Sequence, residues 1–316
     1  MTQAVAIVGA GRMAAAHAVA WAALGVPVRW VVSPRRRPAL EAAPHAGWAR
    51  DLAEALADAS VTIVSVCTPT ATHADLAVEA LAAARHVLLE KPVALTLADA
   101  LRVEAAAGTA PGVLMVAHVV RFFPGYASLA RQVAHGAVGT PRVVRASRIS
   151  SAPEGVDWLA DEEQSGGLLV DFGIHDIDQA CSYLGEPLAV TSLRATAEGA
   201  GDVRVSTGAF RGAVTTTIEY RDGGLAQLLS VSDLPAGRPF QSTLEVVGDT
   251  GVAQTDGSVP GPDPFVEQAR YFLECIGAGA GPSRSPVASA VTALRVALAA
   301  RESLETGRRM LLDPGE

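Results

Sequence analysis

The chain has 316 residues, about twice the length of a typical single domain, so we expect two domains. Hydrophobic residues make up 49% of the composition and charged residues 18%, which supplies a full core and excludes a disordered chain. Lys and Arg total 25 against 33 Asp and Glu, giving a formal net charge of −8 that argues against nucleic-acid binding.

Cysteine usage and the distribution of apolar residues indicate the compartment. Cys67, Cys181 and Cys275 lie far apart and form neither a CxxC pair nor a disulfide scaffold, which favours a reducing compartment. The start, Met-Thr-Gln-Ala, has no basic region, so we expect no signal peptide. No apolar run approaches the roughly 20 residues that span a bilayer. We therefore expect a cytoplasmic protein with no membrane partner.

Residues 1–120 alternate short apolar runs with stretches of helical spacing. The pattern predicts strands at 4–8, 28–32, 61–66, 87–89 and 113–116, and helices at 13–24, 52–57, 73–84 and 97–107. Such alternation is typical of parallel βαβ units with helices on both faces. The sequence predicts an α/β first domain over 1–120, a doubly wound parallel sheet of the Rossmann type.

Residues 121–316 lose this regular alternation. The pattern predicts helices at 126–135, 167–184, 264–276 and 286–306, and strands at 142–150, 190–196, 207–220, 226–231 and 242–247. Alternating apolar and polar residues are typical of a sheet with one wet face. We expect an α+β second domain with an open, mostly antiparallel sheet that binds substrate and mediates oligomerisation.

A glycine motif stands between the first predicted strand and the first predicted helix. In Gly9-x-Gly11-x-x-Ala14, one glycine permits a tight turn, the next lets backbone approach a pyrophosphate, and the small third residue permits close packing. The helix N-terminus favours the negative charge, and Arg12 and Met13 inside the motif join the predicted cofactor site. An ordinary glycine turn is the alternative.

The end of the second predicted strand bears on the choice of cofactor. A carboxylate there would bind a ribose 2′-hydroxyl and select NAD, but the sequence has Ser33. Ser33 is followed by Pro34 and by Arg35, Arg36 and Arg37, whose guanidinium groups can pair with a 2′-phosphate. These residues predict that NADP(H) is preferred, with NAD(H) possible; a solvated basic turn is the alternative.

Further motifs follow in order along the chain. They are Cys67-Thr68-Pro69-Thr70-Ala71-Thr72-His73, then Glu90-Lys91-Pro92, and then a segment from Gly166 to Asp178 that contains Asp171-x-x-x-His175. Together with the glycine loop, they resemble the Gfo/Idh/MocA family of NAD(P)-dependent oxidoreductases over essentially the whole chain. The resemblance implies a Rossmann domain followed by an open sheet domain that covers the nicotinamide. It also implies a homodimer or homotetramer.

The resemblance implies three catalytic residues, Lys91, Asp171 and His175. An ammonium group after a strand end can polarise a carbonyl or stabilise a developing alkoxide. Asp171 and His175 are four apart, so one helix would project both from the same face, where the imidazole could exchange a proton. Without the resemblance, a lysine at a strand end is more often a solvated charge, and a single histidine on a helix is more often a structural residue. The resemblance also makes Pro92 a candidate cis-proline.

The remaining candidate residues depend more on the resemblance. The predicted cofactor contacts are Thr68, Pro69, Thr70, His73, Glu90, Lys91 and His118. The predicted substrate contacts are Lys91, Arg121, Trp158, Asp171 and His175. For His73, the alternatives are helix capping and an indirect contact through another residue; for Trp158, the alternative is packing on the sheet. His118 departs from the polar residue common in the family, and His17 is expected to be a surface or packing residue. We expect no metal site, because metal-ligand spacing is lacking.

These features predict an enzyme, an NADP(H)-preferring oxidoreductase that transfers a hydride between nicotinamide and a carbinol or carbonyl carbon. The expected substrate is a sugar, a cyclitol or a related polyol derivative. One alternative is an imine or non-carbohydrate carbonyl reductase of the same family. The other is a non-catalytic NADP(H)-binding sensor, against which the presence of Lys91, Asp171 and His175 argues.

Overall fold

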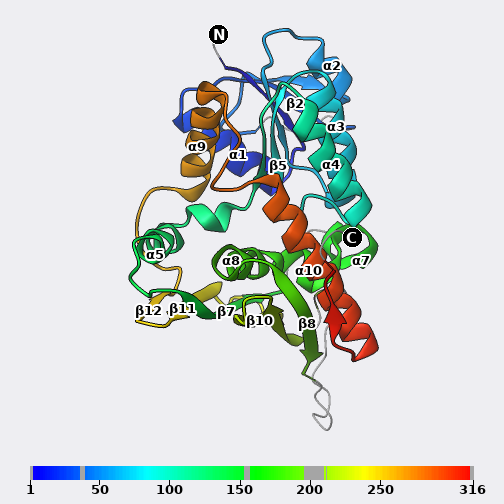
Figure 1. Ribbon diagram of the computed structural model, residues 1–316. Helices are drawn as coiled ribbons and strands as arrows, with labels where there is room; N and C mark the ends of the chain where they lie inside the picture. The colour runs from blue at the N-terminus through cyan, green and yellow to red at the C-terminus, as the bar shows by residue number, and fades with distance from the viewer. Residues whose placement is uncertain (1–2, 36–39, 153–156, 196–209, 211, 314–316) are drawn as a thin grey trace. The chain divides into compact units, whose positions relative to one another are not determined.

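The computed structural model describes residues 3–35, 40–152, 157–195, 210 and 212–313. The chain divides into two compact units: Met1–Phe122 with Pro262–Val291, and Phe123–Gly261 with Thr292–Glu316 (Figure 1). Among the described residues, no helix is long and apolar enough to cross a membrane.

The first unit contains a six-stranded sheet whose neighbouring strands are all parallel. Its strands are β1 (Val5–Val8), β2 (Val28–Val32), β3 (Gly47–Ala49), β4 (Ile63–Val66), β5 (His86–Glu90) and β6 (Leu114–Ala117). Their order, β3-β2-β1-β4-β5-β6, is that of a Rossmann fold, with the topological switch point between β1 and β4. The predicted doubly wound sheet is confirmed; the short edge strand β3 was not predicted.

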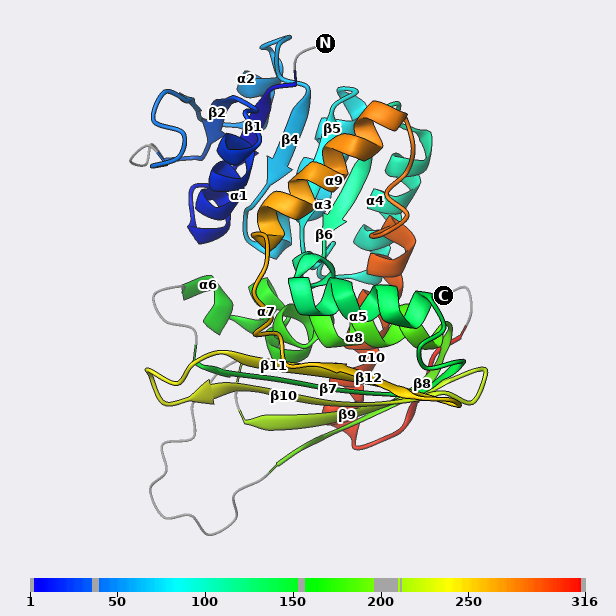
Figure 2. The same ribbon diagram turned by 90° about the vertical axis from the view of Figure 1, so that its left-hand side faces the viewer.

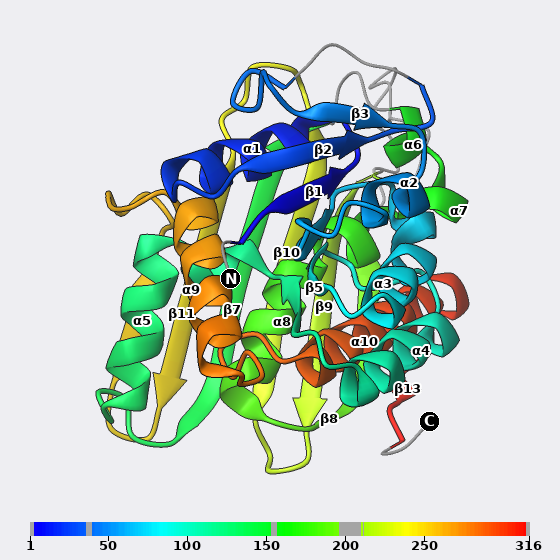
Figure 3. The same ribbon diagram turned by 90° about the horizontal axis from the view of Figure 1, so that it is seen from above.

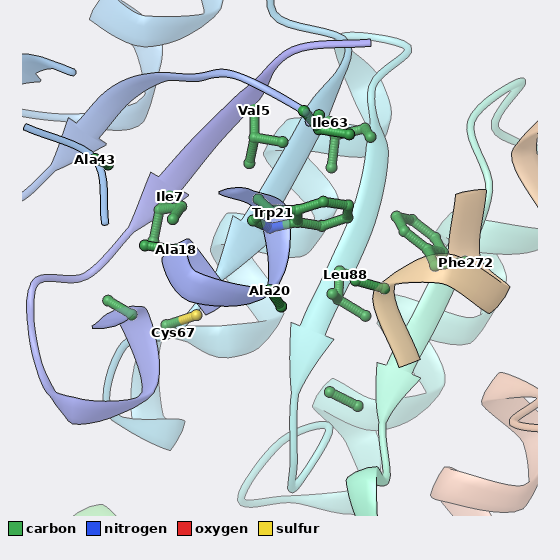
Figure 4. Close-up of a cluster of buried hydrophobic side chains, with 14 of the residues drawn as sticks. Val5, Ile7, Ala18, Ala20, Trp21, Ala43, Ile63, Cys67, Leu88 and Phe272 are labelled. Atoms are coloured by element: carbon green, nitrogen blue, oxygen red, sulfur yellow. The ribbon is translucent and has the colours of Figure 1, made fainter. Parts of the chain in front are cut away.

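Helices cover both faces of this sheet, which is why every residue of β1 and β4 is buried. Figure 3 shows α1 (Arg12–Ala23) and α9 (Pro264–Ala278) on one side, and α2 (Leu52–Leu56), α3 (His73–Ala82) and α4 (Leu97–Thr109) on the other. Between α1, α9 and the strands lies an apolar cluster that includes Trp21 and Phe272, both 0% exposed (Figure 4).

Helix α9 belongs to the first unit although the sequence predicts residues 121–316 as a second domain. Its buried residues Ala269 and Phe272 join the cluster that contains Trp21 of α1 and Leu88 of β5. The physical reason is the apolar face of α9, which is buried against α1, a helix more than two hundred residues earlier in the chain.

The second unit contains a seven-stranded mixed sheet (Figure 2). Its strands are β7 (Pro141–Ser151), β8 (Pro187–Arg194), β9 (Ala213–Tyr220), β10 (Leu225–Leu234), β11 (Gln241–Gly248), β12 (Val252–Thr255) and β13 (Met310–Leu311). The order is β12-β11-β7-β10-β9-β8-β13, and only the pairing of β7 with β10 is parallel in this sheet. The predicted mostly antiparallel sheet is confirmed, while β12 and β13 were missed.

Helices lie on one face of this sheet (Figure 2). They are α5 (Pro124–Ala134), α6 (Asp157–Ala160), α7 (Glu162–Ser165), α8 (Ile174–Leu184) and the later part of α10 (Val287–Thr306). From Val144 to Ile149, every second side chain of β7 is buried and the ones between are partly or fully exposed, because one face meets α8 and the other does not. Part of the predicted strand 207–220 lies outside the described residues; β9 begins at Ala213.

Candidate functional site

The carboxyl ends of the parallel strands bring the first unit's candidate residues to one edge. Gly9, Ser33, Cys67, Lys91 and His118 directly follow β1, β2, β4, β5 and β6. Because the strands are parallel and in register, these five positions share that edge. Open α/β sheets bind ligands at this edge, outside the switch point.

The glycine loop is crowded at Gly9 and open at Gly11. Gly9 has φ +115°, and a Cβ there would lie 2.4 Å from the carbonyl oxygen of Cys67, so a side chain is excluded. A Cβ on Gly11 would meet no heavy atom of the described chain within 4 Å, which leaves open space beside the loop. Helix α1 starts at Arg12 without a side-chain cap or an acidic residue in its first turn. Its N-terminus can therefore hold an anion.

At the end of β2 the chain presents a serine and an arginine. The Ser33 side chain is buried, and its hydroxyl donates to the carbonyl oxygen of Arg35. The Trp48 indole N–H donates to the Ser33 carbonyl oxygen at 3.1 Å, which fixes this turn to β3. Arg35 is exposed, while Arg36 and Arg37 lie outside the described residues. Residues 33–35 contain no carboxylate to bind a ribose.

The segment after β4 forms a short 3-10 turn, Thr70–Thr72, that leads into α3. The Thr72 hydroxyl donates to the Thr68 hydroxyl at 2.7 Å, and Thr70 is buried. Thr68 and Pro69 follow the carboxyl end of β4, and both are predicted cofactor contacts. These contacts themselves remain a prediction.

His73 has a different environment from the one expected of a cofactor contact. Its Nδ1 lies 2.7 Å from the carbonyl oxygen of Pro92, and its Nε2 lies 2.9 Å from that of Thr68. The ring is 1% exposed, and burial lowers its pKa. His73 therefore joins the segment after β4 to the segment after β5, and it does not cap α3, whose N-cap is Thr72 without a side-chain bond.

Lys91 stands at the end of β5, half-buried, and its peptide bond to Pro92 is cis, as the resemblance implied. The neighbouring Glu90 is predicted to contact cofactor, but its carboxylate points into the protein. Oε1 accepts from His17 Nε2 at 2.8 Å, and Oε2 accepts from the Lys91 backbone N–H at 3.2 Å. Both carboxylate oxygens are thus bonded within the protein, so Glu90 is a structural partner here.

His17 is a residue whose role the sequence did not reveal. It lies in α1, 2% exposed, with Nδ1 2.7 Å from the Ser65 hydroxyl. Burial alone would lower its pKa, but interactions with Cys67 and with Glu90 raise the pKa of His17 to about 10. Burial opposes ionisation of Glu90, yet the bond from His17 lowers the pKa of that carboxyl. The two residues form a buried ion pair.

Arg121 is predicted to reach substrate, yet its guanidinium is bonded inside the first unit. It donates to the Arg284 carbonyl oxygen at 2.6 Å and to the Ser289 hydroxyl at 3.1 Å. The Arg284 guanidinium carbon lies 4.0 Å above the Phe122 ring. Arg121 thus ties the short helix η2 (Val119–Phe122) to the segment before α10, a structural role. His118, directly after β6, is 1% exposed.

In the second unit, the predicted helix over 167–184 is two elements. A short π-helix, η3 (Leu168–Phe172), is followed by α8, and the Gly173 N–H donates to the Leu168 carbonyl oxygen at 2.8 Å. Asp171 lies in the π-helix and His175 in the first turn of α8, so the assumed spacing on one α-helix is wrong. The segment begins at Gly166, where φ is +77°. A Cβ at this position would lie 2.5 Å from the Val170 side chain, so only glycine fits without strain.

A buried ion pair holds the start of α8 to the sheet. Arg148 of β7 donates from Nη2 to Asp176 Oδ1 at 2.8 Å and from Nε to Oδ2 at 3.2 Å. The guanidinium carbon lies 5.8 Å and 5.5 Å from the ring centres of Phe172 and Phe240. Burial alone would lower the pKa of Arg148, but the Asp176 carboxylate raises it. This contact fixes the turn that carries His175.

Trp158, the last predicted substrate contact, lies half-buried in α6.

Among the described residues, no group of three or more His, Cys, Asp or Glu side chains could hold a metal ion.

Two family models match the chain, one after the other. Residues 3–118 match a family model described as "Oxidoreductase family, NAD-binding Rossmann fold". Residues 126–254 match the GFO/IDH/MocA C-terminal domain.

Individual proteins give the same result. Myo-inositol 2-dehydrogenase of Thermotoga maritima is 25% identical, over 97% of this chain and 98% of that protein. Uncharacterized oxidoreductase YrbE of Bacillus subtilis is 30% identical, over 66% of this chain and 60% of that protein. The crystal structure of GenD2 from gentamicin A biosynthesis in complex with NAD is 29% identical, with TM-score 0.84, and the match covers 99% of this chain and 97% of that one. The chain belongs to the Gfo/Idh/MocA family of oxidoreductases, with an NAD-binding Rossmann fold.

Proposed function

We propose that this protein is an NADP(H)-preferring oxidoreductase that moves a hydride between nicotinamide and a carbinol or carbonyl carbon of a sugar, a cyclitol or a related polyol derivative. The observation that carries the proposal is Lys91, an amine held directly after β5 at the ligand-binding edge of the Rossmann sheet. Myo-inositol 2-dehydrogenase, which matches nearly the whole chain, supports the substrate class.

The open space at Gly11 and the uncapped start of α1 fit the pyrophosphate of a dinucleotide. When bound, the nicotinamide supplies the hydride acceptor or donor. The finer choice of NADP(H) rests on Ser33 and Arg35: without a carboxylate, a 2′-phosphate meets no repulsion, and the exposed guanidinium can pair with it.

Fluorescence titration with NADPH and NADH tests this cofactor preference. The wild-type protein should bind NADPH more tightly, and Ser33→Asp should reverse the order, because a carboxylate repels the 2′-phosphate and binds the 2′-hydroxyl. Arg35→Ala should weaken NADPH binding and leave NADH binding unchanged. Equal or tighter NADH binding by the wild-type protein would contradict the role of Ser33 and Arg35.

The side chains divide the chemistry among them. Lys91 stabilises the alkoxide or polarises the carbonyl with its positive charge. His175 exchanges the hydroxyl proton with solvent, and Asp171 positions the substrate or the imidazole. Thr68, Pro69, Thr70 and His118 complete the cofactor site from the strand ends, and Trp158 contributes to the substrate site.

Two other functions make different predictions for a substrate assay. An imine or non-carbohydrate carbonyl reductase would reduce its own substrate with NADPH but would not oxidise polyols. A nicotinamide-binding sensor would bind cofactor without turnover, and it would not need Lys91 or His175. NADP⁺ reduction measured across inositols, glucosides and anhydrosugars separates these functions. Turnover with any member supports the proposal, whereas a lack of turnover with every member favours one of the two alternatives.

We also propose a homodimer or homotetramer in the cytoplasm. The face of the second unit's sheet opposite the described helices includes the half-buried Leu229 and the exposed Thr215 at paired positions of β10 and β9. All three cysteines lie within the described residues as free thiols, which agrees with a reducing compartment.

A further inference from the structure

The ion pair of His17 and Glu90 lies directly behind Lys91. It is almost fully buried, with side-chain exposures of 2% and 6%. One Glu90 oxygen binds His17, and the other accepts the backbone N–H of Lys91. A buried carboxylate that lost its cation would be strongly disfavoured, so His17 determines whether Glu90 can hold that N–H.

A second contact holds the other side of the same corner. His73 Nδ1 lies 2.7 Å from the carbonyl oxygen of Pro92, so the backbone is held immediately before and after the Lys91–Pro92 peptide bond. The Lys91 side chain leaves the chain between these two contacts. Its starting point is therefore set by groups within the first unit.

His17 also joins this corner to the glycine loop. It lies in α1, the helix that starts directly after the loop, and Nδ1 contacts Ser65 of β4. One imidazole thus connects the helix that would hold the cofactor pyrophosphate with the strand that ends at Lys91. Displacement of a reacting group by about 1 Å can reduce a rate about 10²-fold.

We propose that His17 is a positioning residue for Lys91: through Glu90 it fixes the backbone from which the Lys91 amine reaches its substrate. This inference rests on the proposed role of Lys91. A purely structural ion pair would stabilise the packing of α1 on the sheet and would leave hydride transfer in the folded protein unchanged.

Two substitutions of His17 separate the contacts of its ring. Glutamine places an amide nitrogen near the position of Nε2, so His17→Gln keeps the bond to Glu90. An asparagine side chain reaches only the position of Nδ1, so His17→Asn keeps the contact to Ser65 and loses the hydrogen bond to Glu90. The matched control is His86→Ala, at the opposite end of the same strand, where Nδ1 accepts the Val113 N–H at 3.0 Å.

The measurement is single-turnover hydride transfer with the polyol that the wild-type protein oxidises fastest, alongside NADPH affinity, the Tm and crystal structures. His17→Asn should slow transfer by about 10- to 100-fold with little change in NADPH affinity. Its crystal structure should show Glu90 turned away from the Lys91 N–H. His17→Gln should restore most of the rate, and His86→Ala should lower only the Tm.

Lys91→Ala, measured in parallel, distinguishes a failure of the proposed function of Lys91 from a failure of the positioning role of His17. If Lys91→Ala transfers hydride at the wild-type rate, the proposed function of Lys91 is wrong. If Lys91→Ala is slow while His17→Asn matches the wild-type rate or leaves the Glu90 contact to Lys91 intact, the positioning role is wrong and the function stands.

Discussion

Lys91 and His175 have different roles in the proposed reaction, and a single substitution tests each role. His175→Ala should lower turnover by about 10²- to 10⁴-fold, the usual loss for a general acid–base group, with cofactor affinity almost unchanged. Lys91→Ala should be at least as damaging, because charge develops where its amine acts. Single-turnover transfer and the Tm of both variants are the measurements.

If these two residues were only structural, the alanine variants would have a lower Tm, but the folded fraction would transfer hydride at the wild-type rate. Wild-type rates for His175→Ala across pH 6 to 9 would assign the proton to another route. Such a pH range brackets the ordinary pKa of histidine, near 6.5.

The buried pair of His17 and Glu90 should give stability a defined dependence on pH. Because the pKa of His17 is raised from 6.5 to about 10, its contribution is fully present below pH 6.5 and is lost as pH rises toward 10. Burial opposes this shift, and the groups that raise the pKa are Cys67 after β4 and then Glu90 of β5; the neighbouring Phe265 ring of α9 carries no charge. Wild type should therefore lose its stability advantage over His17→Gln between pH 6.5 and 10 in denaturant titrations.

An advantage of wild type over His17→Gln that stays constant to pH 10 would show that His17 is neutral in the folded protein.

His86, at the other end of β5, should give stability the opposite dependence on pH. Burial lowers the pKa of His86, so its contribution to stability is present above pH 6.5 and declines as pH falls.

At the scale of elements, the attachment of α8 to β7 depends on one buried ion pair. Arg148→Met leaves the Asp176 carboxylate buried without its cation, which costs about 3–5 kcal/mol of unfolding free energy. Arg145→Met on the same strand is the control: Arg145 pairs with Glu245 at 3.2 Å, but its side chain is 61% exposed, so the loss should be at most about 1 kcal/mol. Denaturant titration of both variants measures the difference.

The double variant Arg148→Met, Asp176→Leu should regain much of the lost stability, because two apolar side chains of similar volume need no counter-charge. Equal stability of Arg148→Met and Arg145→Met would show that the buried pair does not hold α8.

At the scale of the whole molecule, the open sheet face of the second unit should make the protein a dimer or tetramer. Leu229 lies half-buried on this face, next to Thr215 of β9 and Ser147 of β7. An arginine in a closed interface is costly, so Leu229→Arg should shift the protein toward monomers in light scattering at micromolar concentration. Leu101→Arg, at a leucine 44% exposed on α4 of the first unit, should not. A monomeric wild-type protein would refute the assembly.

The sequence by itself determined the Rossmann unit and the edge at which its candidate residues meet. The reason is local: parallel strands read as short apolar runs, and the residue after each run must lie at the carboxyl edge. Gly9, Ser33 and Lys91 were assigned to this edge from their places after such runs. The glycine motif also required a turn that only glycine adopts, and Gly9 shows it with φ +115°.

Only the tertiary structure decided what several of these side chains contact, because their partners are distant in sequence. His17 and Glu90 are 73 positions apart, and Arg121 meets Arg284 across 163 positions, so no spacing rule connects them. The same holds for α9: the sequence predicts a helix with an apolar face, but it does not show that this face packs against α1. The π-helix that separates Asp171 from His175 likewise escaped the sequence, because its geometry depends on the Leu168–Gly173 bond and on burial rather than on residue type.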